Sequence, residues 1–281
     1  MLDPPDANPP DVLRGSWQLV LLIHGYNNDL KAGREAYEGF RLVQQEIGRI
    51  DKPLVDIYWP GDANWGIVSF LYYPWSIGQA QQTAPVLARA LGEAVALSGF
   101  KQIDLVAHSM GGRVTLELIR HLQAVPGVLV RRVAFMAAAV PTFMLIPGDP
   151  HRLREAYDAL VRGGAVSLFS PDDMVLAVAF PAGQTLAGAD EGRFPTALGH
   201  ERWTSPVAPP TLAQEQIYGA GHSDYWGWKE KTRDRARQAG RIVRQFLGLG
   251  PIPERVVEER LRAEREGVEA RETPTRGVEA G

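Results

Sequence analysis

One stretch of the chain determines the architecture around it: Ile103-Asp104-Leu105-Val106-Ala107-His108-Ser109-Met110-Gly111-Gly112. Its apolar first part has the composition of a buried strand, and Val114, Leu118 and Leu122 then recur four residues apart, as on one face of a helix. A strand that turns directly into a helix around a serine is the setting that a G-x-S-x-G turn requires. We therefore predict that Ser109 lies in a tight strand–turn–helix and acts as a nucleophile.

The positions two residues before and two residues after this serine must be very small, because the turn brings neighbouring chain close to them. They are Ala107 and Gly111, so alanine replaces the first glycine of the strict pattern. A serine that merely caps a helix is the ordinary alternative, and the complete pattern favours the nucleophile. His108 adjoins Ser109, but neighbouring side chains in such a turn point apart, so we do not expect it to be the base.

The composition is that of an ordinary globular protein. The chain has 281 residues, 45% of them hydrophobic and 22% charged, which suits one large α/β domain. The net charge of −3 shows no bias toward nucleic acid or an anionic membrane. Cysteine is absent, which excludes disulfides, thiolate metal sites and cysteine nucleophiles. We see no secretory signal and no apolar run of membrane-spanning length, and expect a cytoplasmic protein.

Short apolar runs alternate with longer segments of helical period. The runs that we predict as strands are residues 17–23, 54–59, 103–107, 133–137, 165–169 and 216–218. The segments with helical spacing are residues 36–47, 87–95, 114–122 and about 228–247. Strands that are apolar throughout and separated by helices predict an α/β fold, with a mostly parallel central sheet covered by helices on both faces.

The rest of the chain falls outside this alternation. We expect residues 1–14 to be a flexible lead-in, residues 15–250 to form the domain, and the charged residues 251–281 to be a disordered tail. Residues 62–78 are rich in aromatic side chains and could form a cap or pocket. Residues 177–210, which contain many glycines and prolines, are predicted as a long loop.

An oxyanion hole needs two backbone N–H groups that point at the developing negative charge. One is the N–H of the residue after the nucleophile, here Met110, and the other comes from the loop after the architecture's third strand. We place His24-Gly25-Tyr26 in that loop and choose the N–H of Tyr26, with His24 bracing the loop through hydrogen bonds. By itself, this segment would be interpreted as a plain turn rich in asparagine.

His24-Gly25-Tyr26-Asn27-Asn28, followed by Ala107-His108-Ser109-Met110-Gly111, resembles the α/β-hydrolase superfamily. More narrowly, the chain resembles a bacterial branch of esterase-like hydrolases of unknown function. The resemblance covers about Gln18 to Phe246. It implies the α/β-hydrolase fold and a Ser-His-Asp triad whose acid and base follow the serine in the order acid, then histidine.

The acid and base are sought in that order beyond Ser109. The predicted strand 165–169 is followed by Asp172 and Asp173, and we favour Asp173 because three apolar residues follow it, with Asp172 the alternative. The strand predicted at 216–218 leads into a loop of small residues that carries His222. His200 is the competing histidine, but no good strand precedes it.

The expected reaction is hydrolysis of a carboxylic ester through an acyl-enzyme, with no metal or cofactor and a small-molecule ester as the partner. Trp59 is interpreted as core. Five further aromatic residues are candidates for the acyl or alcohol pocket: Trp65, Phe70, Tyr72, Tyr73 and Trp75. The alternatives are a lipase, thioesterase or amidase with the same triad, and a non-catalytic binding protein of this fold.

Overall fold

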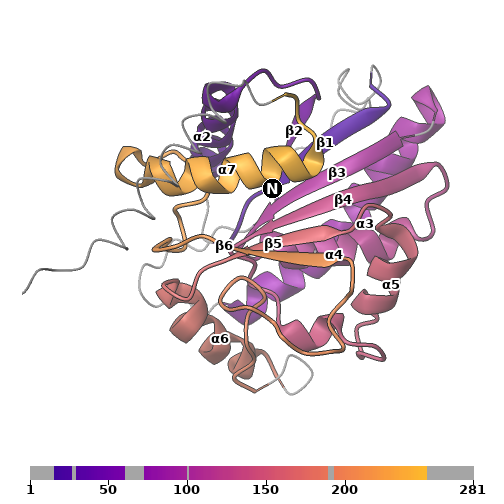
Figure 1. The fold of residues 1–281 in the computed structure, drawn as a ribbon. Helices are drawn as coiled ribbons and strands as arrows, with labels where there is room; N and C mark the ends of the chain where they lie inside the picture. The colour runs from indigo at the N-terminus through magenta and orange to yellow at the C-terminus, as the bar shows by residue number, and fades with distance from the viewer. Residues whose placement is uncertain (1–15, 27–29, 61–72, 100, 189–192, 252–281) are drawn as a thin grey trace, which may run out of the picture.

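The computed structural model describes residues 16–26, 30–60, 73–99, 101–188 and 193–251. Within them a six-stranded sheet runs through the molecule in the order β2-β1-β3-β4-β5-β6, and every neighbouring pair is parallel (Figure 1). The strands are β1 (Gln18–Ile23), β2 (Leu54–Ile57), β3 (Lys101–His108), β4 (Val128–Met136), β5 (Ala165–Phe169) and β6 (Leu212–Gln216). The predicted α/β class is confirmed.

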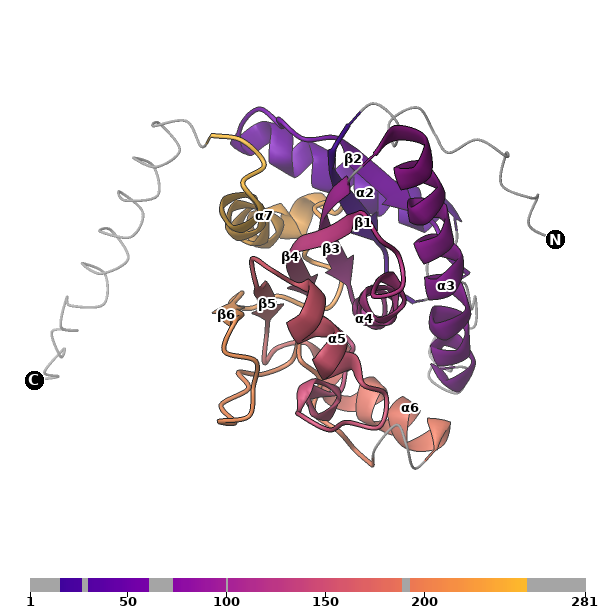
Figure 2. The ribbon, with the colours of Figure 1, turned by 90° about the vertical axis from the view of Figure 1, so that its right-hand side faces the viewer.

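Helices cover both faces of the sheet, as predicted. α2 and α7 pack together on one face, and α3, α4 and α5 lie on the other (Figures 1 and 2). Among the described residues, the α-helices are α2 (Leu30–Ile47), α3 (Tyr73–Ser98), α4 (Gly111–Leu122), α5 (Leu153–Leu160), α6 (Phe180–Ala187) and α7 (Arg233–Leu247). Shorter helical turns are η2 (Thr142–Leu145), the π-helical η3 (Val175–Ala179) and η5 (Glu230–Thr232).

The central strands are apolar throughout because both of their faces are covered. Every residue of β5 is buried, as are all but the first residue of β1 and all but the second of β3. The edge strand β6 alternates between more and less exposed residues. The core therefore follows the middle of the sheet.

The strands end in register at one edge of the sheet. Ile23 of β1 pairs with Ala107 of β3, and the next residue of β3, His108, pairs with Met136 of β4. Phe169 of β5 pairs with Gln216 of β6. The loops after β1, β3, β5 and β6 consequently emerge side by side, at the carboxyl edge where open parallel sheets bind ligands.

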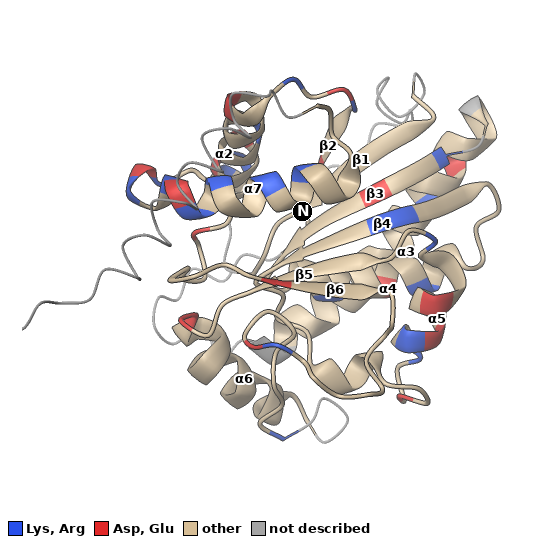
Figure 3. Ribbon diagram, viewed as in Figure 1, with Lys and Arg blue, Asp and Glu red and all other residues tan. Residues whose placement is uncertain are grey.

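An ion cluster centred on the buried Asp104, in the middle of β3, joins the sheet to the end of α7. Asp104 of β3 accepts hydrogen bonds from Lys52 at 3.2 Å and from Nε of Arg131 at 2.8 Å, and Figure 3 shows the acidic band on β3 beside the basic one on β4. Both cations also donate to the carbonyl of Leu247, the last residue of α7. Cations at a helix carboxyl terminus are favourable, so this cluster fixes α7 against the sheet.

The last strand was predicted in the wrong place. The prediction was 216–218, whereas β6 spans Leu212–Gln216. The last three residues of the edge strand β6 are polar (Gln214, Glu215 and Gln216), which weakens its apolar signal. Ile217, by contrast, is fully buried and donates its N–H to the carbonyl of Phe169, although it already lies beyond the strand.

The prediction of a long loop at residues 177–210 is also wrong for its first part. η3 and α6 make residues 175–187 helical. Pro181 lies in the first turn of α6, where a proline does not interrupt a helix. Gly188, with a φ of +122°, ends it. α5 was not predicted either.

Several sequence-based expectations fall wholly or mainly outside the described residues. These are the lead-in 1–14, the tail 251–281 beyond its first residue, and residues 62–72 of the aromatic segment, whose remainder lies in α3. Among the helices that the structure describes, none is both long and apolar enough to cross a bilayer.

Candidate active site

Ser109 occupies the turn between β3 and α4 in a left-handed backbone conformation, with a φ of +54°. Its N–H donates to the carbonyl of Met136 at 3.1 Å, and its own carbonyl accepts from Gly112 and Ala139, each at 3.0 Å. A non-glycine residue in this region costs roughly 1–3 kcal/mol and persists only where its surroundings hold it. The three hydrogen bonds supply that constraint, and the turn has the strained form expected of a nucleophile.

Two glycines allow the turn to pack against the loop after β1. A Cβ atom on Gly111 would lie 2.5 Å from the carbonyl oxygen of His24 and 2.6 Å from that of Ile23. A Cβ atom on Gly25 would lie 2.7 Å from the Cβ of Ser109. Backbone atoms cannot move aside as a flexible side chain can, so Gly111 is required by contact. This is the close approach that the spacing predicted.

The structure joins Ser109, His222 and Asp173 in one chain of hydrogen bonds. Nε2 of His222 lies 2.8 Å from Oγ of Ser109, and Nδ1 lies 2.7 Å from Oδ2 of Asp173. Both hydrogen bonds form together when the imidazole proton is on Nδ1, so that Nδ1–H donates to the carboxylate of Asp173. Nε2 then accepts from the serine hydroxyl.

The neighbouring aspartates have different partners. Asp173 is fully buried, and its Oδ1 accepts from the backbone N–H groups of Val175 at 3.0 Å and Leu176 at 3.1 Å. Asp172 is exposed, and its carboxylate accepts from the N–H of Gly219 at 3.0 Å. Of the two candidates, the structure therefore brings Asp173 to His222.

The loop that carries His222 has a brace that the sequence reading missed. Oδ2 of Asp224 accepts from the N–H of Gly221 at 2.9 Å and from Nη1 of Arg235 in α7 at 3.0 Å. Because this carboxylate accepts from an N–H three positions earlier and from a helix farther along the chain, the sequence around His222 carries no signal for it. Nearby, burial and then the charges of Asp173 and Asp224 raise the pKa of Tyr225.

His24 braces the loop after β1, in agreement with its expected role. Its Nδ1 lies 2.8 Å from the carbonyl of Gly25, and its Nε2 lies 3.4 Å from the N–H of Trp59. The Trp59 indole donates to the His24 carbonyl at 2.8 Å and stacks on its ring, with 5.7 Å between ring centroids. The hydroxyl oxygen of Tyr37 accepts a hydrogen bond from the backbone N–H of His24 at 2.8 Å. The buried Trp59 is core, as predicted.

The two expected oxyanion donors flank the nucleophile. Met110 follows Ser109 directly, and in the described part of the chain its N–H donates no hydrogen bond. Tyr26 follows Gly25, whose Cα faces Ser109. The N–H of Met110, which has no acceptor among the described residues, lies beside the serine hydroxyl, where an incoming carbonyl oxygen would need a donor.

The predicted aromatic pocket is described only in part. Trp65, Phe70 and Tyr72 lie outside the described residues, and Tyr73 is the first residue of α3. Trp75, in the first turn of α3, is 47% exposed. It is therefore available to a ligand and is not core.

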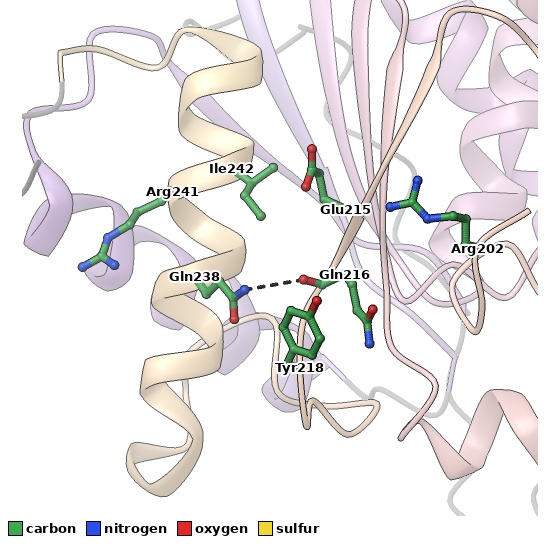
Figure 4. Close-up of a pocket in the computed structure, with 7 residues that line it drawn as sticks. All are labelled: Arg202, Glu215, Gln216, Tyr218, Gln238, Arg241 and Ile242. Carbon is green, nitrogen blue, oxygen red and sulfur yellow. Dashed lines mark hydrogen bonds between the residues drawn. The ribbon is translucent and has the colours of Figure 1, made fainter. Parts of the chain in front are cut away.

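A hollow of about 400 Å³ lies between β6 and α7, away from Ser109 (Figure 4). Gln238 reaches toward the carbonyl of Gln216 across it, at 3.5 Å, while the guanidinium of Arg241 points away from Gln216. Its lining contains no member of the Ser109 hydrogen-bond chain. Within the described residues, no three His, Cys, Asp or Glu side chains are grouped to hold a metal ion.

Comparison with known proteins gives one family and several solved structures. The family described as "Alpha/beta hydrolase of unknown function (DUF900)" matches residues 13–145. This span contains Ser109 and the loop after β1 but neither Asp173 nor His222. No curated protein matches the chain.

The similar solved structures are distant in sequence. A proposed cell-surface hydrolase of Lactobacillus plantarum WCFS1 is 13% identical, with 87% of this chain and 97% of that chain covered and a TM-score of 0.51. A proposed hydrolase of Agrobacterium vitis S4 is 15% identical, with 80% and 87% covered and a TM-score of 0.44. The thioesterase of the prodiginine biosynthetic pathway of Streptomyces coelicolor is 15% identical, with 85% and 91% covered and a TM-score of 0.39. At 13% identity, the likeness to the Lactobacillus plantarum structure concerns the fold alone.

Proposed function

We propose that this chain, which has the α/β-hydrolase fold, is a serine hydrolase that cleaves carboxylic esters through an acyl-enzyme intermediate. The observation that carries the proposal is the continuous hydrogen-bond chain from Ser109 through His222 to Asp173, with separations of 2.8 and 2.7 Å. A serine hydroxyl is a weak nucleophile until an adjacent base accepts its proton, and this geometry supplies the base.

In the proposed reaction, Nε2 of His222 takes the hydroxyl proton of Ser109 as Oγ attacks the ester carbonyl. The carboxylate of Asp173 keeps the imidazole in the required tautomer and stabilises its cationic form. His222 then gives the proton to the departing alcohol, which leaves Ser109 acylated. A water molecule, activated by His222 in the same way, releases the acid and restores the serine.

The N–H groups of Met110 and Tyr26 are proposed to bind the oxyanion of both tetrahedral intermediates. Removal of one such donor costs about 10²–10³ in rate where it has been tested. The strained turn contributes as well, because it presents Oγ at the carboxyl edge of the sheet beside the start of α4. The positive end of that helix favours the developing negative charge.

The test is reaction with a fluorophosphonate probe together with hydrolysis of p-nitrophenyl esters from acetate to octanoate. Ser109→Ala should abolish both, because it removes the one oxygen that attacks. The matched control is Ser205→Ala, which removes a hydroxyl whose described contact is with the backbone of Val207, and it should behave as wild type. Turnover by Ser109→Ala above a few per cent of wild type would refute the proposal, as would failure of the wild type to react with the probe.

The same panel separates the proposed ester from its alternatives. A lipase, a thioesterase and an amidase would use the same groups and would all react with the probe, so substrate preference distinguishes them. In each case a histidine base must be neutral to accept a proton, so kcat/KM should rise with pH in the range where histidine titrates. A flat profile from about pH 5 to 8 would exclude a histidine base.

A further inference from the structure

His108, the residue before the nucleophile, is buried and faces the loop that carries the base. It is 5% exposed, and its Nε2 lies 2.7 Å from the backbone carbonyl oxygen of His222. Because a carbonyl oxygen can only accept, Nε2 carries the proton and donates. The two imidazole rings lie 5.0 Å apart between centroids. The side chain that adjoins the serine thus holds the main chain of the histidine 114 positions away.

The second ring nitrogen of His108 faces the loop after β1. In the described part of the chain, Nδ1 is buried without a hydrogen-bond partner. A Cβ atom on Gly25 would lie only 3.1 Å from it, so the ring edge lies against this loop. His108 therefore touches both loops that flank Ser109, through its two nitrogens, while belonging itself to the strand that ends at the nucleophile.

The surroundings keep this ring uncharged. Burial, followed by the neighbouring His222, lowers the pKa of His108 to about 3, and the charge of Asp173 opposes this shift. A neutral ring with its proton on Nε2 has one donor, directed at His222, and no second proton to place near Gly25. The ring is packed beside Tyr225 and Trp226, with centroid separations of 6.2 and 5.8 Å.

We propose that His108 is a positioning residue for the reaction, whose Nε2–H bond to the His222 carbonyl sets the place of the base relative to Ser109. This inference rests on the proposed function of the same site. His222 follows Gly219, Ala220 and Gly221, whose small side chains cannot anchor this part of the loop. Misplacement of a reacting group by about 1 Å can cost about 10² in rate, so one bond to this carbonyl is enough to matter.

Two substitutions test the inference. His108→Leu replaces the imidazole by an apolar side chain of similar size and so removes the hydrogen-bond donor. His108→Gln restores an N–H group at the end of a side chain of similar reach. Active sites are counted with the fluorophosphonate probe, so that kcat refers to reactive serines only. We expect His108→Leu to lower kcat about 10- to 100-fold, with KM changed less than about two-fold, and His108→Gln to recover most of the loss.

Three kinetic results would overturn the inference. The first is an unchanged kcat per reactive serine in His108→Leu, whatever happens to its melting temperature, because a residue that merely packs would affect only the amount of folded protein. The second is a His108→Gln variant no better than His108→Leu. The third is a loss in His108→Leu as deep as that of His222→Ala, accompanied by a flat pH profile, because His108 would then be the base.

A measurement without turnover separates this inference from the proposed function. In Ser109→Ala, ring ¹⁵N resonances should show His108 neutral and protonated on Nε2 from pH 5 to 8, with that proton slow to exchange. A proton found on Nδ1, or a charged ring in this range, would overturn the inference. If the wild type cleaves no ester while this spectrum is as expected, the proposed function fails and the bond between His108 and His222 stands.

Discussion

The carboxylate of Asp173 and the imidazole of His222 meet at 2.7 Å between Oδ2 and Nδ1, although 49 positions separate the two residues. The other carboxylate oxygen accepts two backbone N–H groups at the start of η3, so the carboxylate is held from both sides. Asp172 has no such role, because its described partner is the N–H of Gly219. Of the two adjacent aspartates, Asp173 therefore binds the imidazole of His222, whereas Asp172 binds only backbone in the described residues.

Substitution of each aspartate by asparagine should separate these settings. Asp173→Asn preserves size but replaces an acceptor by an amide, which favours the wrong tautomer of His222. We expect kcat to fall by up to about 10⁴, the loss that this change causes in a serine protease triad. Asp172→Asn, the matched control, should cost far less. The reverse ranking in steady-state kinetics would transfer the role to Asp172.

The free energy of unfolding should decrease at acid pH, and His108 should account for part of this decrease. Its pKa is about 3 in the folded chain and near 6.5 when exposed, so between these values the unfolded chain binds one more proton. The free energy of unfolding therefore decreases as the pH falls below about 6.5. His108→Gln should reduce this slope by up to about 1.4 kcal/mol per pH unit. Denaturant titrations from pH 7 to 4 measure it, and parallel curves for the two proteins would contradict the shift.

Two glycines on helices should respond oppositely to alanine. Gly111→Ala places a methyl group 2.5 Å from the carbonyl oxygen of His24. We expect a loss of about 1–3 kcal/mol in stability, and a fall in kcat because the loop after β1 must shift. Gly78 in α3 has open space around an added Cβ, so Gly78→Ala should stabilise by up to about 1 kcal/mol. Thermal melts compare them. Equal melting temperatures would mean that the approach at Gly111 is looser than described.

Trp75 tests the predicted acyl or alcohol pocket. Because it is 47% exposed, Trp75→Ala should change stability by less than about 1 kcal/mol, whereas truncating a buried aromatic residue costs about 3–5 kcal/mol. If the indole lines the pocket, the ratio of kcat/KM for octanoate and butyrate esters should shift several-fold, since each methylene is worth roughly 1 kcal/mol. Val86→Ala, at another exposed position of α3, should leave the ratio alone. An unchanged ratio in Trp75→Ala excludes this residue from the pocket.

The parts of the site that could be predicted from sequence are those fixed by local geometry. The turn at Ser109 has a steric signature that spans only a few residues, with Gly111 as its contact point. His222 and Asp173 could be proposed because the resemblance to α/β-hydrolases implies an acid and then a histidine after the serine, and each of the two residues follows a predicted strand. The choice between Asp172 and Asp173 rested on the apolar residues that follow, two of which now lie in η3 with their N–H groups on Asp173.

What the sequence could not provide depends on contacts between distant segments. The partner of His108 is a backbone carbonyl, which has no signature in the sequence at position 222. The position of β6 was predicted wrongly because this edge strand contains several polar residues and its apolar pattern is weak. α6 was missed because its proline and its glycine are typical of a loop, although the proline lies in the first turn.

The loops that meet at the carboxyl edge come from both ends of the chain, and this order has a consequence during protein synthesis. On the proposed assignment, the nucleophile is translated 113 positions before its base. At ribosomal speed, Ser109 would wait roughly 6–23 s for His222 to be made. A nascent chain, or one released early, therefore carries a serine without a proton acceptor. Such a chain cannot acylate itself on cellular esters before the sheet is complete.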